Sequence, residues 1–425
     1  MSLLAIEGGT PVRARPFPEY RTIGEAERRA VLEVLDSGVL SQFVGVDGPD
    51  FLGGPRVRAL EAAWAEHMGS RFAVAMNSAT SGLYAAVGAA RVGPGDEVIV
   101  SPYTMSASAV AAVVYGAIPV FADVDPATFC LDPESVRSRI TPKTRGIIGV
   151  DLFGHPAAWH ELEAIGREHD LVLIEDAAQA PGARLNGKCA GTFGHMGVYS
   201  LNYHKTIHCG EGGVVVTDDP ELAERLRLIR NHAEAVVKAR RPNDLVNMVG
   251  FNYRMTEIEA AIALEQLKKL EGLLAPRIAA ADFLTDRLAK LPGISPPKVA
   301  AGVRHGYYVY AITIDPASAG CDRDWLVAAL RAEGIPLHSG YVAPLYRQPL
   351  YREGVAFGRH GFPLRQADGE LRRYPDGLCP VTEDLHERRL AYLTLVHAAM
   401  TDTDLDDVAR GFEKVLAHAP RLALR

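Results

Sequence analysis

Short apolar segments alternate with helical segments between residues 71 and 178, and this alternation limits the possible folds more than any other feature of the sequence. Apolar stretches typical of strands lie at residues 71–77, 96–102, 118–125, 144–154 and 171–178. Helical patterns lie between most of them, at residues 78–93, 104–117 and 157–170. Strands joined by helices pair in parallel and are covered on both faces. We therefore predict an α/β fold with a mostly parallel sheet flanked by helices.

A long helical pattern at residues 256–290 separates this region from a second one, and Thr256 and Glu259 form a capping box at its start. The α/β rhythm then restarts, and residues 402–418 are expected to form the final helix. We predict three parts: an N-terminal segment (1–55), a large domain (56–275) and a smaller C-terminal α/β domain (276–425). The polar, aperiodic stretch 345–380 is predicted to be a long loop.

Composition excludes several classes of protein. The formal net charge of −7 argues against a non-specific nucleic-acid binder, which would carry a basic excess. No apolar run is long enough to cross a membrane, and the start of the chain lacks the pattern of a signal peptide. The five cysteines are scattered and odd in number, which is typical of reduced thiols. We expect a cytoplasmic protein without a membrane or nucleic-acid partner.

Three polar features follow predicted strands, where α/β proteins bind their ligands. A run of small polar residues at 77–81 precedes a helix, Asp176 ends a very apolar strand, and Lys205 precedes a glycine-rich turn. Each has a simpler interpretation on its own: a helix cap, a partner for an internal arginine, and a surface lysine. Together they offer a phosphate cradle, a carboxylate and an amine. Pyridoxal phosphate needs an anchor for its phosphate, a carboxylate at its ring nitrogen and an amine at its aldehyde.

Six motifs resemble the DegT/DnrJ/EryC1/StrS family of PLP-dependent sugar aminotransferases, from about residue 4 to residue 415. They read NSATSGL, SPYTMSASA, FADVDPATFCLDPE, IEDAAQAPGA, YSLNYHKTIHCGEGGVVVTDD and GFNYRMTEIEAAI. The resemblance implies fold type I of the PLP-dependent transferases, in the aspartate aminotransferase superfamily. It also implies a homodimer with active sites at its interface.

The resemblance assigns roles residue by residue. Lys205 would form the Schiff base with pyridoxal 5'-phosphate, and Asp176 would pair with the ring nitrogen. Gln179 would approach the ring hydroxyl, and Tyr103 would stack on the ring, where relatives often have Phe. The phosphate would be held by Ala79, Thr80 and Ser200, and by Asn252 from the neighbouring subunit. Tyr253, His338 and Tyr341 are weaker candidates for the substrate pocket.

The implied reaction is transfer of an amino group from glutamate or glutamine to a keto sugar or keto cyclitol. Related dehydratases carry His in place of the lysine, and this chain has His204 beside Lys205. Ser200 lies five residues before Lys205 and CGEGG begins four residues after it, so Lys205 is aligned with the Schiff-base position. This favours an aminotransferase over the alternative, a PLP-dependent sugar dehydratase or epimerase.

Two further patterns have a simpler interpretation. His204 and His208 have a spacing that can bind a metal on a helix, but no third ligand is evident, so no metal site is expected. Cys209 is expected to be a small buried thiol.

The keto substrate stays open between a cyclitol and a nucleotide-linked sugar. The stretch LAIEGGTPVRARPFP looks like that of members acting on keto-inositols with glutamine as donor. A nucleotide diphosphate would need cations, and stretch 345–380 offers Arg347, Arg352, Arg359, Arg365, Arg372 and Arg373. These arginines are equally compatible with a solvated loop face.

Overall fold

The computed structural model describes residues 3–365 and 371–419, and its largest sheet confirms the predicted α/β fold. Seven strands form this sheet in the order β1-β9-β8-β5-β4-β2-β3. Their bounds are β1 Phe72–Met76, β2 Glu97–Val100, β3 Ile118–Phe121, β4 Thr144–Val150, β5 Val172–Asp176, β8 Met196–Ser200 and β9 Gly213–Thr217. Only β9 runs against its neighbours, so the other six strands end at one edge, where β9 begins.

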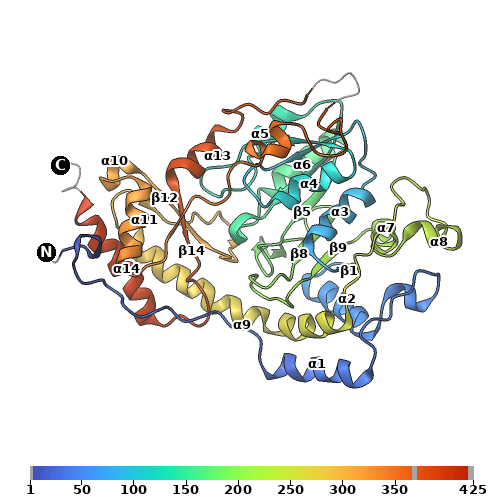
Figure 1. The fold of residues 1–425 in the computed structure, drawn as a ribbon, viewed down its shortest axis with the longest axis horizontal. Coiled ribbons are helices and arrows are strands. Elements are labelled where there is room, and N and C mark those ends of the chain that lie inside the picture. The colour runs from blue at the N-terminus through green and yellow to red at the C-terminus, as the bar shows by residue number, and fades with distance from the viewer. Residues whose placement is uncertain (1–2, 366–370, 420–425) are drawn as a thin grey trace.

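Helices cover both faces of the large sheet (Figure 1). One face packs against α3 (Ala79–Ala89), α4 (Ser106–Val114) and α7 (Pro220–Arg230). The other packs against α2 (Pro55–Met68), α5 (Pro133–Arg139), α6 (Trp159–His169) and α9 (Glu257–Leu288). Side chains of a strand alternate between the two cores: Val98 and Val100 enter the first, and Ile99 enters the second. Burial on both faces explains why these strands read as continuous apolar runs.

A second, four-stranded sheet lies in the C-terminal part of the chain, with the order β10-β12-β14-β13. Its strands are β10 Ile294–Ser295, β12 Tyr310–Ile314, β13 His338–Ser339 and β14 Leu390–Leu393, and every pairing is antiparallel. Helices α10 (Pro316–Ala319), α11 (Arg323–Ala332) and α14 (Asp402–Leu416) accompany it. β14 comes from residues that the sequence pattern left without a strand, and it completes the sheet by pairing with both β12 and β13.

Helix α9 runs along both cores and confirms the long helical pattern predicted from residue 256 (Figure 1). Thr256 caps it and forms the predicted capping box with Glu259. Its first half packs in the large-sheet core as far as Leu274, and Ala280 begins its contacts with the small-sheet core. The division at residue 275 stays a prediction, because the helix is continuous through it. Residues 366–370 and 420–425 of the predicted C-terminal part lie outside the described residues.

The N-terminal segment contacts both parts of the molecule. Leu4 is buried in the small-sheet core, and Arg13 forms ion pairs with Asp404 and Asp407 beside it. Helix α1 (Glu25–Ser37) then lies along α9 (Figure 1). Phe51 is buried in the large-sheet core. The segment therefore spans both cores rather than forming a separate unit.

The stretch 345–380 is less loop-like than its composition suggests. It contains short helical turns at Leu345–Arg347 and Pro349–Arg352. Tyr346, Tyr351 and Tyr374 surround the Phe121 ring of β3, with ring centroids 5.3 to 5.6 Å away. The predicted loop is confirmed for most of the described part of this stretch, but its three tyrosines, spaced irregularly along the chain, anchor it to the large sheet.

The Asn186–Gly187 pair makes the tight turn between β6 (Arg184–Leu185) and β7 (Lys188–Cys189). Both residues have positive φ, which Asn and Gly tolerate best. Nowhere in residues 3–365 and 371–419 does a helix combine the length and the apolar character needed to cross a bilayer.

Candidate active site

A cavity of about 200 Å³ lies at the edge where the parallel strands of the large sheet end. Residues that follow or end four of these strands form much of its wall: Ser78 after β1, Val150 in β4, Asp176 in β5 and Ser200 in β8. Its full lining is Ser78, Ala79, Thr80, Leu83, Thr104, Met105, Ala107, Val150, Asp176, Ala178, Gln179, Ser200, Asn202, His204, Lys205, Glu211, Gly212, Tyr308 and Tyr341. The three polar features singled out in the sequence therefore meet in one place.

Asp176 ends β5 and is almost completely buried. Its Oδ2 accepts a 2.7 Å hydrogen bond from the Ser108 hydroxyl of α4, and its Oδ1 accepts one from the Ala178 N–H. Burial raises the pKa of this carboxyl, while these donors and the Lys205 ammonium oppose the rise. A buried carboxylate of this kind is stabilised further by a cation placed against it.

Lys205 lies in the loop that joins β8 to β9, at the edge where both strands meet the cavity. The loop is held at its base by Leu201 N–H to Gly212 C=O and Cys209 N–H to Leu201 C=O. The Lys205 Nζ lies 4.6 Å from the centre of the Tyr308 ring. Burial lowers the pKa of Lys205 to about 8, although the negative charge of Asp176 acts in the opposite direction.

The N-terminus of α3 forms a cradle for an anion beside these two residues. Ser78 caps the helix by accepting from the Ser81 N–H, so the N–H groups of Ala79 and Thr80 have no acceptor within the helix. Gly213 allows the chain to pass close by: a Cβ there would lie 2.5 Å from the Ala79 nitrogen. Ser200 contributes to the same cavity wall.

Gln179 is fixed at the cavity by two hydrogen bonds. Its Oε1 accepts from the Phe153 N–H at 2.8 Å, and its Nε2 donates to the Tyr341 hydroxyl at 3.0 Å. Tyr341 also lines the cavity, as expected for one of the weaker substrate candidates. Burial raises the pKa of Tyr341 to about 12, so its hydroxyl stays protonated and can donate or accept.

Tyr103 is not among the residues that line the cavity, although it was predicted to stack on the ring. Its side chain is fully buried behind the wall and meets Tyr341 edge-on, with centroids 5.9 Å apart. Met105 lines the cavity instead and is 61% exposed. The two residues stand next to α4 in an irregular segment, where sequence spacing does not fix the direction of a side chain.

Asn252, Tyr253 and His338 do not line the cavity within a single chain. Asn252 is exposed, and its carbonyl accepts a 3.4 Å hydrogen bond from Asn77, which immediately precedes the α3 cradle. Tyr253 stacks on Phe251, and His338 stacks on Tyr392.

Conversely, Asn202, Glu211 and Tyr308 line the cavity without having been predicted. Asn202 and Glu211 flank Lys205 in the YSLNYHKTIHCGEGG motif, so that motif held the signal; Tyr308 comes from a distant segment.

The six arginines of stretch 345–380 lie elsewhere, and none lines the cavity in the part of the chain that the structure describes. Arg347 forms ion pairs with Asp376, Glu383 and Glu387. Arg352 pairs with Asp376, and Arg372 pairs with Glu97 at the opposite edge of the large sheet. These three arginines therefore serve the packing of their own segment.

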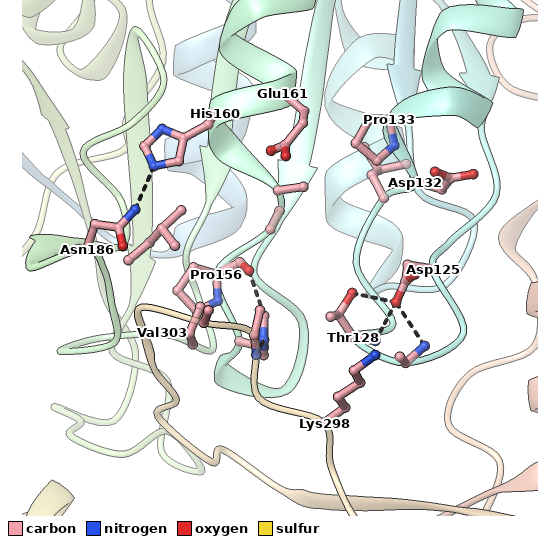
Figure 2. Close-up of a pocket in the computed structure, with 18 residues that line it drawn as sticks. Asp125, Thr128, Asp132, Pro133, Pro156, His160, Glu161, Asn186, Lys298 and Val303 are labelled. Carbon is pink, nitrogen blue, oxygen red and sulfur yellow. Dashed lines mark hydrogen bonds between the residues drawn. The ribbon is translucent and has the colours of Figure 1, made fainter.

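A second cavity of about 370 Å³ lies between the loops that follow β3 and β4 and the segment 298–303 (Figure 2). None of the predicted site residues lines it. Several of its polar groups already have partners: Asp125 accepts from the N–H and hydroxyl of Thr128, and Asn186 bonds to His160. The cavity that contains Lys205 is thus the better candidate for chemistry.

Comparisons with known proteins show which family the chain belongs to. Residues 22–413 match the DegT/DnrJ/EryC1/StrS aminotransferase family. The chain is 35% identical to the L-glutamine:2-deoxy-scyllo-inosose aminotransferase of Streptomyces kanamyceticus over 99% of both chains. It is also 35% identical to the L-glutamine:scyllo-inosose aminotransferase of Streptomyces griseus over 98% of both. The solved structure of DesI in the presence of its TDP-sugar product superposes with a TM-score of 0.80 at 30% identity, covering 99% of this chain and 97% of DesI.

These matches extend over nearly the whole chain, and they confirm the fold type I of PLP-dependent transferases that the motifs implied. They also confirm transamination over the dehydratase or epimerase alternative. The protein is an aminotransferase, and it belongs to the DegT/DnrJ/EryC1/StrS aminotransferase family.

Proposed function

We propose that the protein is a PLP-dependent aminotransferase that moves an amino group from glutamine or glutamate to a keto cyclitol. The observation that carries this proposal is the meeting of Lys205, Asp176 and the α3 N-terminus in one cavity. Two features of the chain fit the cofactor. The cradle at the α3 N-terminus is open only because residue 213 lacks a Cβ. The buried Asp176 carboxylate has no ion-pair partner within 4 Å among the described residues.

When bound, pyridoxal phosphate supplies an aldehyde that reacts with amines and a ring that accepts an electron pair. Ala79, Thr80 and Ser200 bind the phosphate in this proposal, through the helix N–H groups and the serine hydroxyl. Asp176 would stabilise a proton on the ring nitrogen, and the Ser108 hydroxyl orients the Asp176 carboxylate. Gln179 contacts the ring hydroxyl while Phe153 fixes its amide.

Lys205 moves the reacting proton. A neutral amine is needed to take a proton from the substrate carbon, and burial lowers the pKa of Lys205 to about 8. About a tenth of the Lys205 amine is therefore neutral at pH 7, compared with less than about 0.1% of a solvated lysine. The same amine could act first as a base and, once protonated, as an acid.

Met105, rather than Tyr103, is the residue that would contact the cofactor ring. It lies on the cavity wall beside Thr104 and Ala107, whereas the tyrosine is behind that wall. A thioether makes favourable contacts with aromatic rings and adapts its shape more easily than a second aromatic ring. We infer that this chain holds the ring by a flexible apolar contact.

A keto cyclitol fits the cavity better than a nucleotide-linked sugar. A diphosphate requires cations, and the cationic groups on the wall of the described chain are Lys205 and, when protonated, His204. Glu211 and Asp176 add negative charge to the same wall. Two relatives act on inosose derivatives with glutamine as donor, by their names, whereas DesI was solved with a TDP-sugar. Tyr341, Asn202 and Glu211 are suited to hydrogen-bond the hydroxyl groups of a cyclitol.

The active sites are shared between two copies of the chain in this proposal. Asn252 is exposed and lies beside its own α3 cradle, at a surface that carries Val44, Val46 and Val249. Gly45 and Gly250 both lie close to His232, which brings these valines together. Exposed apolar residues grouped in this way are typical of a protein–protein interface. Asn252 would reach the phosphate held by the partner.

The half-reactions test the function directly. The protein loaded with pyridoxal phosphate is expected to lose its visible absorbance with L-glutamine and to release one keto acid per site. Addition of scyllo-inosose should restore the absorbance, whereas nucleotide-linked keto sugars should not. Lys205→Ala should show neither change. Full turnover by Lys205→Ala would contradict the proposed function. Restoration of the visible absorbance by nucleotide-linked sugars alone would overturn the substrate assignment.

A further inference from the structure

Two carboxyl groups that the proposed reaction does not use lie in the core behind the candidate site. Asp151 follows β4, and Glu175 precedes Asp176 in β5. Both are completely buried, and neither forms an ion pair with any residue that the structure describes. Because neighbouring side chains of a strand point to opposite faces, Glu175 lies on the face of β5 away from Asp176. Two uncompensated charges in such a place would be very costly.

The hydrogen-bond donors around the pair are distributed unequally. Glu175 accepts from three backbone N–H groups, those of Gly191, Phe193 and Gly194. At Asp151, Oδ1 accepts from the Ala157 N–H and the Trp159 indole, both at 2.8 Å. Its Oδ2 is buried and has no donor among the described residues. The backbone therefore favours a carboxylate at Glu175, and the free Oδ2 is the place for a proton.

The other titratable groups that face the pair are neutral. Tyr199 of β8 and Cys130 of the loop before α5 lie within the electrostatic influence of the pair, and burial raises the pKa of both groups. Glu175 pairs across the β4–β5 ladder with Gly149, two residues before Asp151, so both carboxyl side chains are on the same face of the sheet. Burial raises the pKa of Asp151 well above its ordinary value, and the charge of Glu175 acts in the same direction.

We propose that Asp151 and Glu175 share one proton, with Asp151 as the neutral acid that donates a hydrogen bond to Glu175, and that this pair positions Asp176 and Gln179. The connection runs through the backbone. The Asp151 N–H donates to the Asp176 carbonyl at 3.1 Å, and the loop that Asp151 anchors presents the Phe153 N–H to Gln179. Asp151 is thus a positioning residue. The location of the proton depends on the fold alone, whereas its importance for the site rests on the proposed function.

Infrared spectroscopy of the cofactor-free protein locates the proton. A band of a protonated, buried carboxyl group should be present at neutral pH. It should shift when aspartate carries ¹³C in its side chain, keep its position when glutamate is labelled, and disappear in Asp151→Asn. A shift with labelled glutamate, or no protonated band, would overturn the assignment.

Stability as a function of pH gives a second readout. The raised pKa means that folded protein binds one more proton than unfolded protein above about pH 4, so stability falls with rising pH. Asp151→Asn keeps the hydrogen bonds but cannot titrate. The melting temperature of Asp151→Asn should therefore increase relative to that of the wild type as the pH rises from 5 to 8. A difference that stays constant over this range would contradict the proposal.

The positioning role is tested by three variants of matched size or chemistry. Asp151→Asn should bind pyridoxal phosphate within about 2-fold of the wild type, whereas Asp151→Ala should bind it at least 10-fold more weakly. Glu175→Gln should melt well below Asp151→Asn, because its NH₂ group would face backbone N–H groups. Equal cofactor affinity in the Asn and Ala variants would overturn the positioning role. These outcomes do not depend on turnover, so they remain readable if the proposed reaction is wrong.

Discussion

A lysine at the end of a buried sheet is explained by the chemistry of its surroundings. Lys205 faces the carboxylate of Asp176 and the ring of Tyr308, and its pKa is lowered because burial outweighs the nearby negative charge. An ordinary surface lysine would be charged at neutral pH and would be a poor nucleophile. The site therefore favours a reactive amine at a cost in folding stability.

That cost gives a pH-dependent prediction for the cofactor-free protein. Since the pKa of Lys205 is lowered to about 8, the unfolded chain binds more protons than the folded protein between pH 8 and about 10, and stability should rise across this interval. Reductive methylation followed by peptide mass spectrometry should find Lys205 half-reactive near pH 8. Exposed Lys143 and Lys298 serve as internal controls, and Lys205 should react faster than either of them at that pH. Equal rates at all three would show that Lys205 is not perturbed.

Sequence reasoning located the residues whose position follows from strand ends. Asp176 and the 77–81 run come directly after apolar strands, and parallel strands bring such residues to one edge. Tyr103 and Met105 could not be told apart in this way, because neither lies in a strand or a helix with a fixed period. Tyr308 reaches the cavity from more than 100 residues away along the chain, and no local pattern signals such a contact.

At the scale of elements, the β8–β9 hairpin brings Lys205 and the α3 cradle together. β9 begins with Gly213, whose backbone lies against the start of α3. The hairpin therefore fixes the lysine and the anion cradle relative to each other with few intervening atoms.

Gly213→Ala should disrupt this arrangement. The added Cβ would lie 2.5 Å from the Ala79 nitrogen and 2.5 Å from the Ser78 carbonyl carbon, and both are backbone atoms that cannot rotate away. We expect at least a 10-fold loss of affinity for pyridoxal phosphate in equilibrium dialysis. Gly272→Ala in α9 is the matched control, because a Cβ there meets nothing within 4 Å. It should bind normally and gain about 0.5–1 kcal/mol in stability. Normal cofactor binding by Gly213→Ala would show that the cradle is not at α3.

At the scale of elements, local sequence patterns were sufficient to predict several strands and the start of one helix. The five apolar stretches became β1 to β5, and Thr256 capped its helix, because periodicity and caps are local properties. The small sheet and the 345–380 segment were harder. Their strands are only two to five residues long, and the segment is held by aromatic contacts to Phe121, more than 200 residues earlier in the chain.

At the scale of the whole molecule, the proposed shared site predicts complementation between inactive subunits. If Asn252 serves the partner's cavity, a mixed dimer of Lys205→Ala and Asn252→Ala chains contains one site with both changes and one site with neither. Co-expressed and co-purified mixed dimers should therefore recover about half of the wild-type activity, with both parent dimers well below this. No recovery in a verified mixed dimer would place Asn252 in its own chain's site.

The interface itself is tested by charge substitution. Val249 is 61% exposed beside Asn252, and Val355 is 53% exposed in the 345–380 segment. Val249→Asp should shift the protein towards the monomer in sedimentation velocity and lose activity, because a carboxylate would be buried without a partner. Val355→Asp should remain dimeric and active. A dimeric, fully active Val249→Asp protein would exclude this surface.

The unbroken course of α9 gives the molecule a mechanical property. At 1.5 Å per residue, its 32 residues form a rod about 48 Å long. One end packs against the small-sheet core, and the other end begins five residues after Asn252. A stiff rod transmits a tilt along its length, and α9 stays continuous through Pro276, although proline cannot donate a backbone hydrogen bond. In the proposed dimer, a movement of the small sheet as a ketone enters would thus be transmitted along α9 to Asn252, and through Asn252 to the cavity of the other subunit.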